Sequence, residues 1–157
     1  MEILALTNRH YQEFLDLCEY LDELHRNLLP EDFQKPSHQP RTLESFIAWT
    51  KDPKTCLLGA FDNGGLVGFC YGVVQDLGQI PFYIPKKILF IEMLVVSADF
   101  QKRGIGQALL EHAETWSKER TIREIRLTVY HQNDGARTFY SRNGFEDFQL
   151  KVRKTLL

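Results

Sequence analysis

The chain has 157 residues, 43% of them hydrophobic and 25% charged, and its net charge at neutral pH is −2. This length fits one domain, residues 1–157, with a sizeable core, and the composition excludes extensive disorder. The charge gives no sign of nucleic-acid binding, and no window approaches the roughly 18 apolar residues of a membrane span. Three widely spaced cysteines, in no CxxC or Cys/His array, predict reduced core thiols in a cytoplasmic protein and no metal site.

The first half of the chain predicts a strand, two helices and a β-hairpin. Apolar residues at helical spacing indicate the first helix, and Thr42 is a suitable N-cap for the second. The turn sequence DNGG between two apolar runs predicts the hairpin. In chain order these elements are the strand 2–6, the helices 11–28 and 42–52, and the strands 55–61 and 66–75.

The second half predicts a buried strand followed by alternating helices and strands. The run ILFIEMLVV is almost continuously apolar, which is typical of a strand buried on both faces. Gly144 is suited to end the last helix. These elements are the strand 88–96, a helix from the turn 101–106 to residue 116, the strand 124–130, the helix 134–144 and a final strand 145–156. The order β-α-α-β-β-β-α-β-α-β, without repeats, indicates one α+β domain.

The sequence QKRGIG, Gln101 to Gly106, stands between the buried strand and a long helix. A helix N-terminus has unpaired backbone N–H groups and a positive dipole end, so it binds anions such as phosphate. Glycines 104 and 106 would let a pyrophosphate approach the backbone, and Lys102 and Arg103 add positive charge. An ordinary glycine-bearing loop is the alternative. A dinucleotide-binding turn has less support, because its third glycine is missing.

Two motifs in register resemble those of the GNAT superfamily of N-acetyltransferases. QKRGIG matches the family's acetyl-CoA pattern Q/R-x-x-G-x-G/A. NDGARTFYSRNGF, Asn133 to Phe145, matches its second signature, N-x-x-A-x-x-F-Y-x-x-x-G-F. The resemblance covers about Ile88 to Phe148. It implies a mixed, mostly antiparallel central sheet that splays at its fourth strand and has helices on both faces.

The resemblance also implies where acetyl-CoA binds. The pyrophosphate is expected on the backbone amides of the turn, and the pantetheine arm along the strand, bonded to its backbone like an added strand. Asn133 is expected to contact this arm, and Ala136 to let its helix approach closely. The expected cofactor-binding residues are Leu94, Val95, Val96, Gln101, Lys102, Arg103, Gly104, Ile105, Gly106, Gln107, Asn133, Ala136 and Tyr140.

Acetyl transfer to an amine needs a base for the amine proton and an acid for the departing thiolate. Glu92 is the only charged residue in ILFIEMLVV, and an apolar setting makes a carboxylate a better base. Strand alternation places Glu92 with Leu94 on one face, and Ile91 with Met93 on the other. The alternative for Glu92 is a structural carboxylate paired with a neighbouring element.

Tyr140 is the candidate acid. In the GNAT family the tyrosine at this place often lies near the sulfur and can donate a proton to the thiolate. A phenol with a pKa of ~10 is protonated at neutral pH, as this role requires. The alternative is a packing tyrosine that merely contacts the cofactor, and Phe139 is expected in the core.

The sequence leaves the acceptor open between a small amine and a protein N-terminus or lysine. Prolines around the segment IPFYIP suggest a cover over the cleft, which favours a small amine. Acidic residues near the end of the first helix would attract a cation, although a solvated helix end has the same composition. They are Asp22, Glu23, Glu31 and Asp32.

Two functions other than transfer also remain open. A non-catalytic acyl-CoA-binding module would keep the phosphate turn without a proton route, and an interaction domain would leave the turn unused. The resemblance also implies a possible homodimer, because members of the GNAT family often pair through their C-terminal strands. The segment 145–156 alternates apolar and polar residues, although an ordinary final strand has the same pattern.

Overall fold

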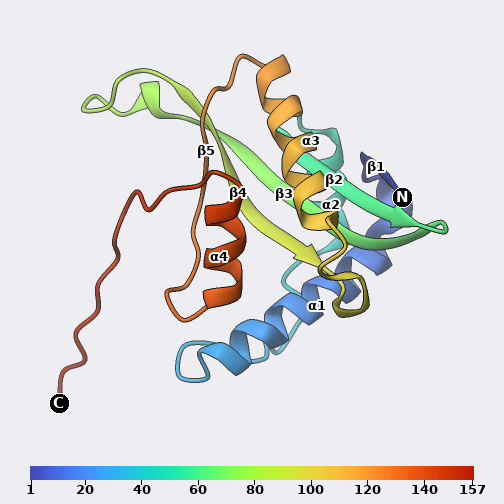
Figure 1. Ribbon diagram of the computed structural model, residues 1–157, viewed down its shortest axis with the longest axis horizontal. Helices are drawn as coiled ribbons and strands as arrows, with labels where there is room; N and C mark the ends of the chain where they lie inside the picture. The colour runs from blue at the N-terminus through green and yellow to red at the C-terminus, as the bar shows by residue number, and fades with distance from the viewer.

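The computed structural model describes residues 1–157 and has a central five-stranded sheet with helices on both faces (Figure 1). The strands lie side by side in chain order. The first four are antiparallel, and the fifth runs parallel to the fourth. They are β1 (Glu2–Ala5), β2 (Thr55–Asp62), β3 (Gly65–Asp76), β4 (Lys87–Val96) and β5 (Ile125–Leu127). The mixed, mostly antiparallel sheet confirms the expected fold class.

Four α-helices cover the sheet, and two separate cores lie beneath them. Phe14 of the first helix and Phe46 of the second are fully buried in one core. Leu109 of the third helix packs with Leu89 in the core on the opposite face, and the fourth helix joins this core through Phe139. The helices are α1 (Tyr11–Leu28), α2 (Leu43–Lys51), α3 (Ile105–Glu119) and α4 (Asp134–Arg142). Short 3₁₀ turns span Asn8–His10, Leu77–Gln79 and Ala98–Phe100.

The turns and helix caps that were predicted from local sequence are present in the structure. The Thr42 hydroxyl accepts a hydrogen bond from the Ser45 backbone N–H at 3.1 Å and so caps α2. Asn63 and Gly64, with φ values of 49° and 84°, close the hairpin between β2 and β3. Such left-handed pairs match the twist of hairpin strands, which is why DNGG was informative.

The strand β4 contains a β-bulge at Glu92. On β3, Tyr71 pairs with Met93 and Gly72 pairs with Ile91, so Glu92 has no partner residue. The extra residue shifts the alternation of side chains along the strand. Ile91 therefore packs in the α3-side core together with Leu94, whereas Met93 packs in the α1-side core. The predicted grouping of Ile91 with Met93 was wrong.

The strands β4 and β5 separate after a short paired stretch. Only Leu89–Ile91 pair with Ile125–Leu127. The remainder of β4, up to Val96, pairs with β3 on one side and has no strand on the other. This is the splay at the fourth strand that the family resemblance implied.

The final strand predicted at 145–156 is wrong, because this segment is irregular in the structure. It leaves the body of the molecule beyond α4 (Figure 1). The strand predicted at 124–130 is limited to the three residues of β5, so this edge offers few backbone groups for pairing. An alternating pattern forms a strand only where a partner is available.

All three cysteines are free and buried, as the sequence predicted. Burial raises the pKa of Cys18 and of Cys56 to about 12, and it also raises that of Cys70. None of the helices combines the length and apolar character needed to cross a bilayer.

Candidate active site

The turn between β4 and α3 leaves the start of a helix open to a ligand. Gly104 is the N-cap of α3, with φ 79° and ψ 1°, and no side chain caps the helix. Any side chain at Gly104 would be strained by this left-handed backbone. A Cβ there would meet nothing within 4 Å, so the space beside Gly104 is open. The geometry suits an anion bound by the first amides of α3.

Charged side chains surround this turn. Lys102 and Arg103 are exposed, and the Arg103 guanidinium lies 4.9 Å from the centre of the Phe100 ring. The Gln107 amide donates to Glu111 at 2.9 Å, and the Ile105 side chain is buried in the core. Because its side chain is buried, Ile105 can contact a cofactor only through its backbone.

Gly106 has a packing role that the sequence did not predict. A Cβ at Gly106 would lie 3.1 Å from Cζ and 3.3 Å from Cε2 of Phe139. The missing side chain therefore lets α4 pack closely against the start of α3. Room for a pyrophosphate beside Gly104 and Gly106 remains a prediction, and at Gly106 the packing of α4 is an additional reason for glycine.

Gln101 joins the turn to two other elements. Its side-chain N–H group donates to the Val96 carbonyl at 3.1 Å and to the Tyr20 hydroxyl of α1 at 2.9 Å. Tyr20 was missed by the sequence reasoning, because nothing in its local sequence marks it as a neighbour of the turn. Val95 is buried, so this part of β4 offers a pantetheine arm its backbone, together with the half-buried side chains of Leu94 and Val96.

Asn133 is the N-cap of α4. Its side-chain carbonyl accepts a hydrogen bond from the Ala136 backbone N–H at 3.1 Å. This cap fixes the direction in which α4 leaves the loop after β5. The side-chain N–H groups of Asn133 can still donate to a ligand.

Tyr140 packs between two aromatic rings on α4 and just after it. The ring centres of Phe139 and Phe145 lie 5.2 and 5.5 Å from that of Tyr140. Burial raises the pKa of Tyr140 well above its ordinary value, and the Cys70 thiol adds to this effect. The phenol therefore remains protonated throughout the neutral range, as a proton donor must.

Glu92 projects from the bulge and is exposed to solvent. The apolar setting expected for this carboxylate is therefore not found. Burial raises the pKa of Tyr71, and the charges of Glu92 and Asp52 raise it further. Tyr71 belongs to the α1-side core, whereas Tyr140 packs on the α3 side.

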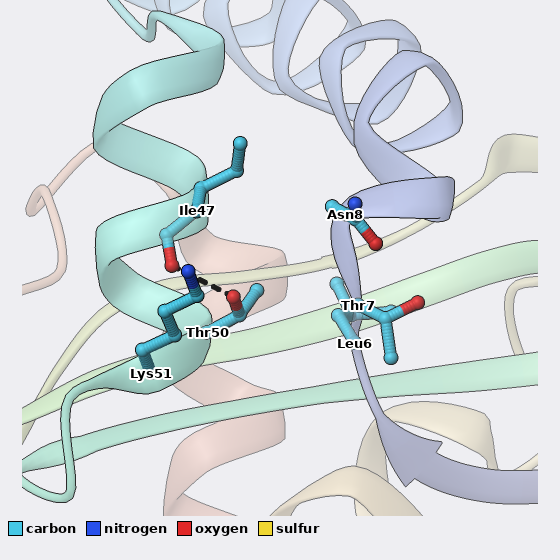
Figure 2. Close-up of a pocket in the computed structure, with 6 residues that line it drawn as sticks. All are labelled: Leu6, Thr7, Asn8, Ile47, Thr50 and Lys51. Carbon is cyan, nitrogen blue, oxygen red and sulfur yellow. Dashed lines mark hydrogen bonds between the residues drawn. The ribbon is translucent and has the colours of Figure 1, made fainter.

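A cavity of about 620 Å³ lies between α1 and the start of α4. Tyr20 and Asn133 both border it, so it adjoins the turn at Gln101 and the second motif. Its lining residues are Tyr20, Glu23, Leu24, Asn27, Leu28, Gln132, Asn133, Asp134 and Gly135. A second cavity, of about 310 Å³, lies between α2 and the segment after β1 and contains none of the motif residues (Figure 2).

The acidic residues near the end of α1 are not equivalent. Asp22 forms two hydrogen bonds with the Arg41 guanidinium, at 2.7 and 2.9 Å, and Asp32 pairs with Arg153 at 2.9 Å. Glu23 lines the larger cavity and forms no ion pair. Glu23 is therefore the carboxylate of this group that is free to meet a cation in the cavity.

The segment that was predicted to cover the cleft lies elsewhere. Phe82 is 96% exposed. Its loop, residues 80–86, lies at the opposite end of β4 from the turn 101–106 (Figure 1). The IPFYIP segment therefore does not cover the cleft. His25 stacks on Phe33 with ring centres 5.5 Å apart, and burial lowers its pKa. Nowhere do three or more histidine, cysteine, aspartate or glutamate side chains gather as metal ligands.

Comparison with known proteins places these features in one family. Residues 19–145 match the Acetyltransferase (GNAT) family. Over 88 residues the chain is 39% identical to the uncharacterized N-acetyltransferase MJ1207 of Methanocaldococcus jannaschii, a match that covers 56% of this chain and 38% of that protein. It is 27% identical over 127 residues to the spermidine N(1)-acetyltransferase of Thermoplasma acidophilum, covering 81% and 70%.

Solved structures share the whole fold. A tetramutant of the BH1408 protein from Bacillus halodurans superposes with a TM-score of 0.92 at 22% identity, covering 99% of this chain and 100% of that one. The aminoglycoside N-acetyltransferase AAC(6')-Iy, solved with CoA, gives a TM-score of 0.73 at 15% identity, covering 99% of each chain. The family match, the shared fold and the two motif segments agree, and the chain therefore belongs to the Acetyltransferase (GNAT) family.

Proposed function

We propose that the protein transfers an acetyl group from acetyl-CoA to a small amine with at least two positive charges, by direct attack on the thioester. The observation that supports this class of acceptor is the position of Glu23, an unpaired carboxylate that lines a cavity next to both motif segments. A carboxylate at one end of such a cavity can hold one ammonium group while a second amine reacts. The free core thiols favour a cytoplasmic location.

Acetyl-CoA fits the features of the turn and the splay. The uncapped start of α3 and the open space at Gly104 suit the pyrophosphate. The unpaired edge of β4 after Ile91 offers backbone groups to the amides of the pantetheine arm. In this arrangement the thioester lies near the bulge, between Glu92 and Tyr140.

The reaction requires two proton transfers, one from the amine and one to the departing thiolate. The amine nitrogen attacks the thioester carbonyl carbon and loses a proton to Glu92, directly or through water. The carbon–sulfur bond then breaks, and the Tyr140 hydroxyl donates a proton to the departing thiolate. The bulge matters here because an extra residue re-aims a side chain at the end of a paired stretch.

Glu92→Gln tests the base. The uncharged amide cannot accept the amine proton, so we expect kcat/KM to fall by about 10²–10⁴-fold near neutral pH. The defect should shrink at alkaline pH, where the amine loses its proton without help. Rates of coenzyme A release against pH measure both effects. Glu114→Gln, an exposed change on α3, is the control, and an unchanged rate in Glu92→Gln would assign Glu92 a structural role.

Glu23→Gln tests the acceptor. We expect the KM for spermidine to rise about tenfold because one charge-assisted contact is lost. The affinity for acetyl-CoA and the KM for a monoamine such as butylamine should change little. Glu31→Gln, in the loop after α1, is the matched control.

The proposed function as a whole is tested by coenzyme A release from acetyl-CoA with a panel of amines. Faster release with spermidine than with monoamines would support a polycationic acceptor. Release with peptides alone would overturn the small acceptor in favour of a protein N-terminus or lysine. Binding of acetyl-CoA without release for any amine would indicate a non-catalytic acyl-CoA-binding module.

A further inference from the structure

The Gln101 side chain fastens the turn 101–106 to two other parts of the molecule. Its Nε2 group donates to the Val96 carbonyl at 3.1 Å and to the Tyr20 hydroxyl at 2.9 Å. An amide nitrogen carries two hydrogens, so these bonds use both of its donors. Val96 ends the strand that leads into the turn, whereas Tyr20 lies on α1, 81 positions before Gln101. The start of the turn is therefore tied to β4 and to α1 at once.

The Val96 carbonyl lies on the unpaired edge of β4. The Ser97 backbone N–H donates to the Val67 carbonyl of β3 at 2.8 Å. Backbone groups of successive residues in an antiparallel strand point alternately to its two sides. Val96 therefore presents its N–H and C=O groups to the side that has no neighbouring strand, as does Leu94. Because Gln101 occupies the Val96 carbonyl, the Leu94 groups and the Val96 N–H remain for the pantetheine arm of acetyl-CoA.

The turn needs support because one of its residues has an unfavourable backbone conformation. Lys102, directly after Gln101, has a φ value of 59°, and residues with a side chain rarely adopt this left-handed conformation. Such a conformation persists only where surrounding contacts hold it. The two hydrogen bonds of Gln101 act immediately before Lys102. The arrangement of the amides that follow, where the pyrophosphate is proposed to bind, therefore depends on Gln101.

The Tyr20 hydroxyl group is held in place by the packing of its ring. Tyr20 is half-buried, and the ring packs against the α1-side core. The Gln101 side chain is exposed, so water competes for its hydrogen bonds in the free protein. A ligand that covers the turn excludes this water, and the bonds then become stronger. The bond between Tyr20 and Gln101 thus favours the ligand-bound state over the free state.

We propose that Tyr20 is a positioning residue for acetyl-CoA, which through Gln101 keeps the turn 101–106 in the conformation that binds the pyrophosphate. This inference rests on the proposed function, because it takes the turn as the binding site of acetyl-CoA. Tyr20 also lines the cavity proposed for the acceptor. The two contributions are separable, because the hydroxyl group acts on the turn and the ring forms part of the cavity wall.

Calorimetric titration of Tyr20→Phe with acetyl-CoA, in the absence of any amine, tests the proposal. We expect the Kd to rise about fivefold, because one hydrogen bond that supports the turn is lost. Gln101→Met keeps the length of the side chain without its donors and should raise the Kd at least as much. The double variant should bind no more weakly than Gln101→Met, because Tyr20 acts only through Gln101. At saturating acetyl-CoA the KM for spermidine should change little in Tyr20→Phe, since the ring is retained.

Tyr11→Phe is the matched control. Tyr11 also lies on α1, and its hydroxyl donates to the Arg41 carbonyl, outside the turn, at 2.7 Å. Loss of this bond should leave the Kd for acetyl-CoA unchanged. Wild-type affinity in Tyr20→Phe, additive losses in the double variant, or equal losses in Tyr20→Phe and Tyr11→Phe would each overturn this inference and leave the proposed function intact. A wild type that binds no acetyl-CoA would overturn both.

Discussion

Gly104→Glu is expected to abolish acetyl-CoA binding in a folded protein. The space beside Gly104 is open and adjoins the uncapped start of α3, so the new carboxylate would occupy the place proposed for the pyrophosphate. It would block that site and repel a ligand of the same charge. Calorimetric titration with acetyl-CoA should show heat of binding for the wild type and none for the variant.

The control for this variant must carry the same backbone strain. Gly64, in the hairpin turn between β2 and β3, has φ +84° and open space around its Cβ position, much like Gly104 at +79°. Gly64→Glu therefore has a similar cost of about 1–2 kcal/mol for a left-handed residue with a side chain. It should bind acetyl-CoA normally. Undiminished affinity in Gly104→Glu would refute the assignment of the turn.

Tyr140→Phe is expected to lower the rate of acetyl transfer by about 10²-fold or more, with little change in acetyl-CoA affinity. The ring, which packs between Phe139 and Phe145, is retained, so the loss isolates the hydroxyl group. Single-turnover measurements are the appropriate readout, because slow product release can hide a change in the chemical step. Tyr83→Phe, at an exposed loop position, serves as control.

The pH dependence gives a second test of Tyr140. Because burial raises its pKa, the phenol keeps its proton well beyond neutral pH. Any decline of the wild-type rate that reflects loss of this acid should therefore begin only at strongly alkaline pH. Tyr140→Phe should lack that decline. Equal single-turnover rates in the two proteins would instead make Tyr140 a packing residue.

Local features of the chain were predictable because their causes are local. The hairpin at Asn63–Gly64 and the cap at Thr42 depend on residues adjacent in sequence, and both formed as expected. The two motifs likewise lie at the starts of α3 and α4. The bulge at Glu92 was not predictable, because one unpaired residue does not alter the pattern of an apolar run. It nevertheless reverses the alternation of side chains between the two faces of the strand.

Other features depend on contacts between distant parts of the chain. Asp22 is neutralised by Arg41, and Gln101 bonds to Tyr20 across 81 positions of sequence. The packing role of Gly106 depends on where α4 lies, which no pattern around Gly106 reveals. The prediction of a final strand was wrong for a related reason. The segment does alternate apolar and polar residues, but a strand also needs a neighbouring strand, and β5 is too short to supply one.

The burial of all three cysteines determines how the proposed acetyl transfer can be assayed. Thiol-specific reagents react with thiolates, and the pKa values of about 12 for Cys18 and Cys56 leave almost no thiolate at the pH of an ordinary assay. Burial also keeps such reagents away from the sulfur atoms. A colorimetric thiol reagent in the reaction mixture should therefore report the free coenzyme A alone, with a flat baseline from the native protein and no loss of activity through modification.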